Sequence, residues 1–73
     1  MPVTQENIDD VFTYHAPDDQ QLATLDIVRA DAKLLAHHIV DRVPMCTDQQ
    51  AALRSLRQCV HMANAAIMLK GAI

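Results

Sequence analysis

The chain has 73 residues, of which 51% are hydrophobic, with one glycine, two cysteines and a formal charge of −3 at pH 7. This length allows one small domain, and the negative charge argues against a protein that grips nucleic-acid polymers through a broad basic face. No run approaches the roughly 20 apolar residues of a membrane span, and no signal-peptide pattern opens the chain, so we expect a cytoplasmic protein with reduced cysteines and no membrane contact.

Prolines at Pro17 and Pro44 divide the chain into three segments, and each has a helical pattern. The first segment covers residues 1–13. Within it, the sequence predicts a short helix from about Thr4 to Phe12, with Thr4 as its N-cap. Because so short a helix is marginal in isolation, we expect it to form only by packing on another part of the protein.

The second segment, residues 18–43, begins with the pattern of a capping box, in which Gln21 follows Asp18 by three residues. Apolar residues then recur at intervals of three and four. They are Leu22, Leu25, Val28, Ala32, Leu35, Ala36, Ile39, Val40 and Val43. This spacing predicts a long amphipathic helix that Pro44 ends.

The third segment, residues 47–70, begins with a similar capping pattern. Thr47 is the predicted N-cap, Asp48 lies in the first turn, and Gln50 is placed to bond back to the cap residue. Its main apolar stripe consists of Leu53, Leu56, Val60, Ala63 and Ile67, and Lys70 with Gly71 suits a helix C-terminus. Because the connection between the second and third segments is short, we expect their helices to lie antiparallel and side by side. We therefore predict an all-α protein, a single domain over residues 1–73 with a short N-terminal helix and a long antiparallel helical hairpin.

The run from Met62 to Leu69 is apolar around nearly the whole helix, so a single partner helix cannot cover it. The estimated burial in a compact monomer only offsets the conformational entropy of ordering so short a chain. Both observations predict a homo-oligomer with this end of the hairpin at its centre. Within the run, Asn64 is either a polar residue that sets the register of association or a ligand contact.

The sequence offers little for catalysis, and we expect no enzyme activity and no cofactor. No Ser-His-Asp or Cys-His arrangement has a recognisable context, and a glycine-rich phosphate loop is excluded because Gly71 is the only glycine. We expect no metal site, since the adjacent His37 and His38 point about 100° apart on a helix.

Binding of a small anion is the more promising chemistry. Arg29 and Lys33 are four residues apart and project from the same side of the second helix. The alternative is a solvated face on which Asp26 partners Arg29 or Asp31 offsets the charge. Just ahead of this helix, Tyr14 and His15 could flank a planar base, although Tyr14 could equally pack the first helix onto the hairpin.

Several runs together resemble one known family. They are Tyr14-His15-Ala16-Pro17, Gln20, Ile27-Val28-Arg29, Ala32-Lys33, Val43-Pro44 and Met62-Ala63-Asn64-Ala65-Ala66-Ile67. In these runs the chain is similar to small phage and prophage hairpin-domain proteins, a family that includes the anti-CBASS and anti-Thoeris sponges. The resemblance covers most of the chain, from Tyr14 to Ile67.

This resemblance implies a homo-oligomer, often a hexamer, that sequesters a cyclic oligonucleotide or a cyclic ADP-ribose-like signal without cleaving it, inside an infected or lysogenic bacterial host. By position, Tyr14 corresponds to the residue that stacks on a base and Arg29 to the basic residue that meets a phosphate. Lys33, His15 and Asn64 are lesser candidate contacts. Where a relative has an arginine at a second site, for cyclic trinucleotides, this chain has Ala65, so that site is not expected in the same form.

A different class of function is also compatible with the sequence. The apolar surface from Met62 to Leu69 could dock a host or phage protein, which would make the chain a small helical interaction module.

Overall fold

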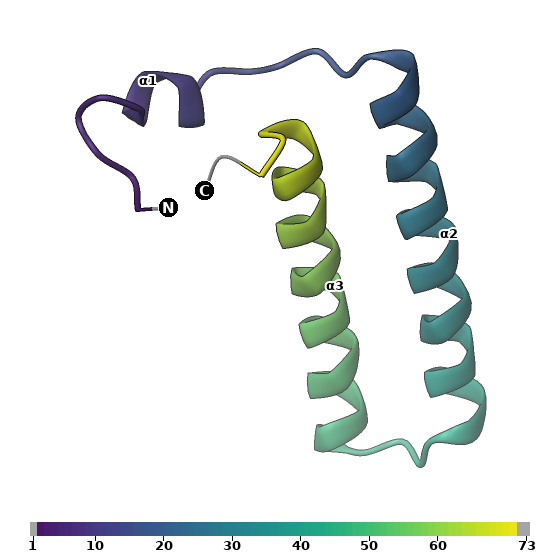
Figure 1. Ribbon diagram of the computed structural model, residues 1–73. Helices are drawn as coiled ribbons and strands as arrows, with labels where there is room; N and C mark the ends of the chain where they lie inside the picture. Colours follow the sequence, from purple (N-terminus) through teal and green to yellow (C-terminus); the bar gives the residue numbers. More distant parts are fainter. Residues whose placement is uncertain (1, 72–73) are drawn as a thin grey trace.

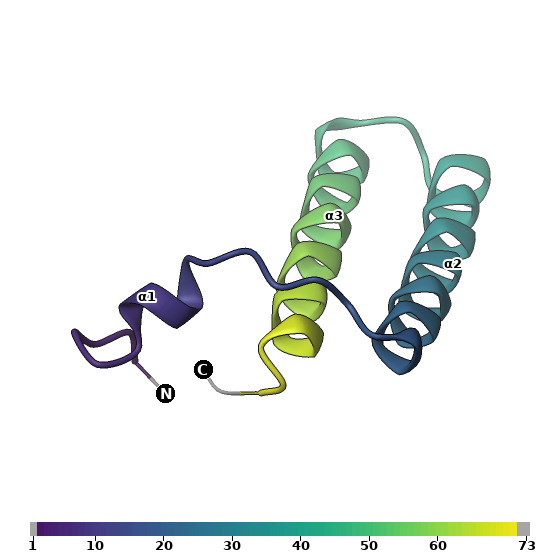
Figure 2. The same cartoon turned by 90° about the horizontal axis from the view of Figure 1, so that it is seen from above.

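The computed structural model describes residues 2–71, which contain three helices and no strand (Figure 1). Helix α1 covers Ile8–Val11, α2 covers Asp19–Arg42 and α3 covers Thr47–Met68. The all-helical prediction is confirmed. In both views, α2 and α3 lie side by side and run in opposite directions, while α1 is set off from the pair (Figures 1 and 2).

The start of α2 has the predicted capping box. The Asp18 carboxylate accepts a hydrogen bond from the backbone N–H of Gln21 at 2.8 Å, and the Gln21 side chain accepts one from the backbone N–H of Asp18 at 3.0 Å. The Gln21 amide also donates to the carbonyl oxygen of Ile67 at 3.2 Å. This capping residue therefore ties the start of α2 to the end of α3 as well as satisfying the helix terminus.

The predicted cap of α3 is wrong by one residue. Cys46 has extended backbone angles and is the N-cap, with its Sγ accepting from the backbone N–H of Gln49 at 3.5 Å, whereas Thr47 is already helical. Gln50 does not reach back to the cap, and its amide donates to the side chain of Gln49 instead. The chain enters the helix directly after the Pro44 turn, one residue before the better capping side chain.

Gln49 is the one buried residue in the described part of the chain, with 2% of its surface exposed. Its side-chain amide donates to the carbonyl oxygens of Val43 at 3.3 Å and Ile39 at 3.5 Å. The Ile39 carbonyl already accepts from the backbone N–H of Val43 at 3.1 Å, whereas the carbonyl of Val43, the C-cap of α2, has no backbone donor in residues 2–71, so Gln49 supplies the missing donor there. This contact fixes the closed end of the helix pair.

The first helix is shorter than the sequence predicts, and Thr4 is not its cap. Instead, the Asn7 side chain accepts from the backbone N–H of Thr4 at 2.7 Å and donates to the carbonyl oxygen of Pro2 at 3.1 Å. These local bonds favour a turn over continued helix. Only one helical turn, Ile8–Val11, follows Asn7.

Helix α3 ends in a Schellman motif, two residues before the predicted boundary. The backbone N–H of Lys70 donates to the carbonyl oxygen of Ile67 at 3.2 Å, and that of Gly71 donates to Ala66 at 3.0 Å. Lys70 has a φ of 54° and Gly71 a φ of 74°. The left-handed position that usually carries glycine in this motif is therefore occupied by a lysine.

The apolar faces of α2 and α3 meet without enclosing a core. Among the described residues no hydrophobic side chain is buried, and those along the seam are half-buried: Leu25, Val28, Ala32, Ala36 and Ile39 on α2, and Leu53, Leu56, Val60, Ala63 and Ile67 on α3. The accessible surface of 5833 Å² compares with about 4,500 Å² for a compact monomer of this mass. The single copy is therefore an open structure.

Replacing Lys70 with glycine should stabilise the protein, because glycine adopts positive φ without the steric cost that a Cβ imposes. We expect a gain of about 1 kcal/mol in the free energy of unfolding relative to Lys70→Ala, which removes the charge but keeps the Cβ. Thermal denaturation followed by circular dichroism measures the difference. Equal stability of the two variants would contradict the assigned role of the left-handed position.

Gln49→Leu should lower the free energy of unfolding by about 1–3 kcal/mol, because it leaves the carbonyl group of Val43 without its donor and removes the second donor to Ile39. Gln50→Leu is the matched control, since Gln50 is exposed and bonds only to its neighbour. Urea denaturation compares the two. If Gln50→Leu lowered the free energy of unfolding as much as Gln49→Leu, the buried amide of Gln49 would have no special role in stability.

Candidate functional site

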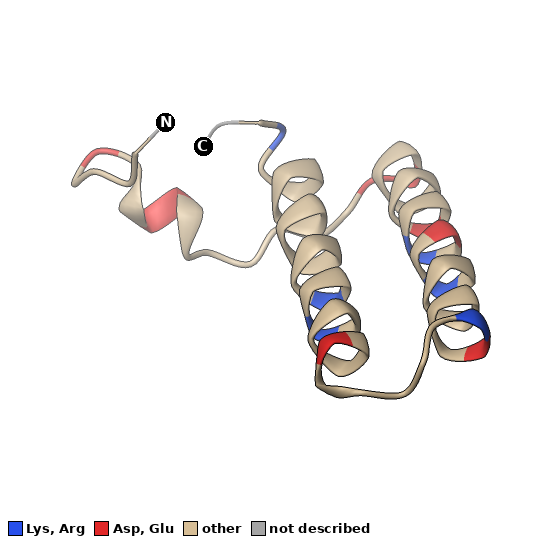
Figure 3. Cartoon of the chain, turned by 90° about the horizontal axis from the view of Figure 1, so that it is seen from below, with Lys and Arg blue, Asp and Glu red and all other residues tan. Residues whose placement is uncertain are grey.

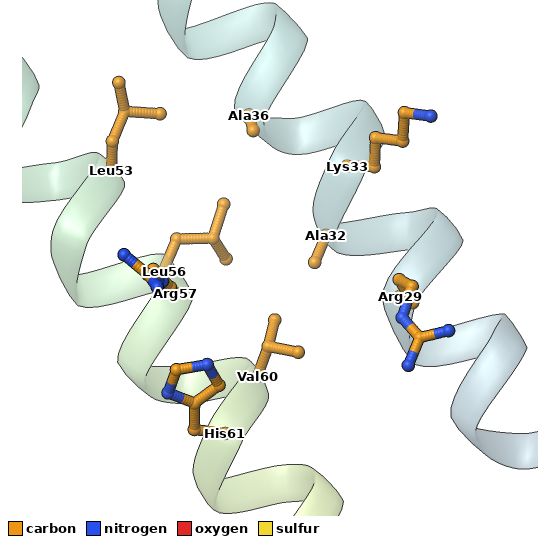
Figure 4. A pocket seen from close by; sticks show the side chains of 9 residues that line it. All are labelled: Arg29, Ala32, Lys33, Ala36, Leu53, Leu56, Arg57, Val60 and His61. Atoms are coloured by element: carbon orange, nitrogen blue, oxygen red, sulfur yellow. The ribbon is translucent and has the colours of Figure 1, made fainter.

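A groove of about 310 Å³ opens between α2 and α3 near the middle of the pair. Nine residues line it: Arg29, Ala32, Lys33, Ala36, Leu53, Leu56, Arg57, Val60 and His61. Figure 4 shows the side chains of Leu56 and Val60 directed into the space between the helices, with small alanines opposite them on α2. The groove thus has an apolar interior contributed by both helices.

Basic side chains flank this apolar interior on both helices. Arg29 and Lys33 come from α2, and Arg57 and His61 come from α3 (Figure 4). Each pair is four residues apart, which places its members on one side of their helix. No carboxylate is among the lining residues, and basic segments of the two helices lie at about the same level (Figure 3). The arrangement suits an anion with an apolar or planar portion.

Arg29 has one nearby carboxylate, as the sequence-based alternative anticipates. Its Nη1 lies 3.8 Å from Oδ1 of Asp26, and the two side chains are 65% and 77% exposed. So long and exposed an ion pair contributes little and is screened by salt. A phosphate bound in bidentate geometry would compete effectively for the guanidinium.

Two lining residues, Arg57 and His61, are not among the anion-binding residues that the sequence suggests. The available signal was their spacing, which repeats that of Arg29 and Lys33. A second signal was charge, because Asp48 is the single acidic residue of Thr47–Met68.

Tyr14 and His15 lie in a different hollow. This second space, of about 330 Å³, is lined by Val11, Thr13, Tyr14, His15, Ala65, Met68 and Leu69. Tyr14 is 85% exposed, so it does not pack α1 onto the long helices within one copy. The two hollows share no lining residue, and the structure does not bring Tyr14 into the same space as Arg29.

His15 is held in place by Asp10. Its Nε2 lies 2.7 Å from the backbone carbonyl oxygen of Asp10 and 3.5 Å from a carboxylate oxygen of the same residue. Both are acceptors, so Nε2 carries a proton and donates to the carbonyl. The imidazole therefore braces the segment between α1 and α2, next to the exposed ring of Tyr14.

Asn64 lies on α3 outside both hollows. Its Oδ1 is buried but has no hydrogen-bond partner among the described residues. A buried carbonyl oxygen without a donor costs free energy, so the arrangement within one copy is incomplete at this point. Because this oxygen is already enclosed within one copy, a donor from another copy or from a ligand would reach it only after rotation of the Asn64 side chain.

Nowhere in residues 2–71 do three or more histidine, cysteine, aspartate or glutamate side chains gather in a group that could hold a metal ion. The same range contains no helix long and apolar enough to cross a bilayer.

Comparison with known proteins gives one result. A family model described as "Acb2/Tad1, hairpin domain" matches residues 4–68. No curated protein and no solved structure matches the chain. The matched region takes in both hollows described above, apart from Leu69.

Proposed function

The chain belongs to the Acb2/Tad1 hairpin-domain family, and we propose that it binds and sequesters a nucleotide immune second messenger without cleaving it. The ligand is a cyclic oligonucleotide or a cyclic ADP-ribose-like signal, as in the anti-CBASS and anti-Thoeris sponges that the sequence resembles. The observation that carries this proposal is the family match over residues 4–68. The basic groove between α2 and α3 supports it chemically.

Tyr14 and Arg29 are the principal contacts of the proposed site. The exposed Tyr14 ring can stack on a base, which is worth about 1–3 kcal/mol, and the Arg29 guanidinium can bind a phosphate in bidentate geometry. Lys33 adds a second cation beside Arg29. His15, next to Tyr14, and Asn64, with its unpartnered oxygen, are further candidate contacts.

The ligand would lie between copies of the chain. Because Tyr14 and Arg29 line different hollows of one copy, a site that uses both is completed by residues from two copies. An interface can also enclose a polar ligand that an open helix pair leaves in solvent.

We propose a homo-oligomer, with a hexamer favoured by the family resemblance. The absence of any buried hydrophobic side chain in residues 2–71 supports association, because burying this apolar surface against another copy is favourable. A hollow lined by Met62, Ala65, Ala66 and Leu69 lies at the end where we expect the copies to meet. The small alanines there permit close approach of helices.

Sequestration fits the groove better than turnover does. A sponge requires tight binding from a preformed cavity, and it needs no nucleophile paired with a base. The groove lining consists of alanine, aliphatic and basic side chains, of which the His61 imidazole is the one suited to proton transfer.

Arg29→Gln should weaken binding of the signal by about tenfold or more, because a hydrogen bond to a charged group is worth about 1.5–3 kcal/mol. Arg42→Gln is the matched control, since Arg42 lies on the same helix but outside the groove. Isothermal titration calorimetry against a panel of cyclic nucleotides and cyclic ADP-ribose isomers measures the change. Light scattering should give the same mass for the wild type, Arg29→Gln and Arg42→Gln.

The bound nucleotide should also be recovered intact when the complex is denatured, as judged by chromatography. The proposal would be contradicted by absence of binding across the whole panel, or by recovery of a cleaved product. If Arg29→Gln caused the oligomer to dissociate, Arg29 would be a structural residue.

A second candidate function is a helical interaction module. Met62 is 60% exposed beside the apolar hollow at the end of α3, which a host or phage protein could occupy. Failure to bind any nucleotide of the panel would favour this alternative.

A further inference from the structure

We propose that Arg57 and His61 of α3 are ligand-binding residues, and that with Arg29 and Lys33 of α2 they form one site for a ligand carrying two phosphate groups. Each helix would then bind one phosphate. This inference rests on the proposed function and deepens it, because it assigns the second wall of the groove and requires a second phosphate on the signal.

The geometry places the two basic pairs on opposite sides of one space. All four side chains line the same groove of about 310 Å³. Figure 4 shows Arg29 and Lys33 on α2, Arg57 and His61 on α3, and the side chains of Leu56 and Val60 between them. A ligand seated on this apolar strip would meet basic groups on both sides.

The charge distribution makes the groove unusual for this chain, whose formal charge is −3. None of the lining residues is acidic, and α3 has no acidic residue after Asp48. Asp26, which lies outside the lining, makes the one ion pair found with any of these four residues in the described range, at 3.8 Å from Arg29. A local concentration of positive charge on an acidic protein attracts anions selectively.

The same concentration of charge is unfavourable without a bound anion. Arg29 and Lys33, which are four residues apart on α2, repel each other, and Arg57 of α3 adds a third cation to the same groove. A ligand with two phosphates would neutralise cations on both helices, whereas a single phosphate could satisfy one wall only. This difference is why we infer two phosphates.

The apolar interior indicates what joins the phosphates. Ala32 and Ala36 leave room on the α2 side, opposite Leu56 and Val60. Such a strip accepts the face of a base or a ribose through apolar contact and contributes no competing charge. An apolar strip between basic residues suits a compact nucleotide with two phosphates better than a free inorganic anion.

Arg57→Gln tests the inference, with Arg54→Gln as the matched control. Arg54 is an exposed residue of the same helix, one turn before Arg57, and does not line the groove. Calorimetry with a cyclic dinucleotide, cyclic ADP-ribose and inorganic pyrophosphate measures affinity, and light scattering measures the mass of each variant. We expect Arg57→Gln to weaken binding of the nucleotide signal by about tenfold and Arg54→Gln by less than about twofold, with unchanged mass.

The outcomes separate this inference from the proposed function. If a nucleotide binds the wild type and Arg57→Gln equally well, the two-phosphate site is wrong and the proposed function stands. If neither nucleotide binds but pyrophosphate binds in a way that depends on Arg57 and not on Arg54, the site stands and the proposed function is wrong. Absence of all binding overturns both. A changed mass for Arg57→Gln would show that Arg57 serves association of the copies instead of ligand binding, and would overturn the inference.

Discussion

The structure depends on one constraint, which is that two helices in contact along a single seam cannot bury their own apolar residues. In the described range the seam leaves Leu25, Val28, Leu56 and Val60 half-buried, and no hydrophobic side chain is enclosed. Since apolar burial is the main favourable term in folding, most of the available stabilisation is still unused in one copy. Association of copies is the natural way to use it, and it would also create the enclosed spaces that a ligand needs.

Polar contacts hold the helix pair in register despite the thin seam. Gln49 bonds to the carbonyl groups of Ile39 and Val43 at the closed end, and Gln21 bonds to Ile67 at the open end. Both glutamines lie in the first turn of a helix, where each reaches across to the other helix. With the helices in this register, Arg29 and Arg57 line the same groove.

The features that could be predicted from the sequence are mostly local. The capping box of Asp18 and Gln21 depends on residues three apart, and it forms as predicted. Local competition also explains two errors, because the turn after Pro44 makes Cys46 the cap of α3, and the Asn7 side chain shortens the first helix. The spacing of Arg57 and His61 marks them as a basic pair. Which residues of α2 face them depends on the register between the two helices, and no local pattern encodes that register.

We propose that a single copy is not stable alone, and the most direct test is the dependence of thermal unfolding on protein concentration, with the mass followed by light scattering. We expect the midpoint of unfolding to rise with concentration, and helical structure to be lost as the assembly dissociates on dilution. A well-folded monomer whose unfolding midpoint is the same at all concentrations would contradict the claim.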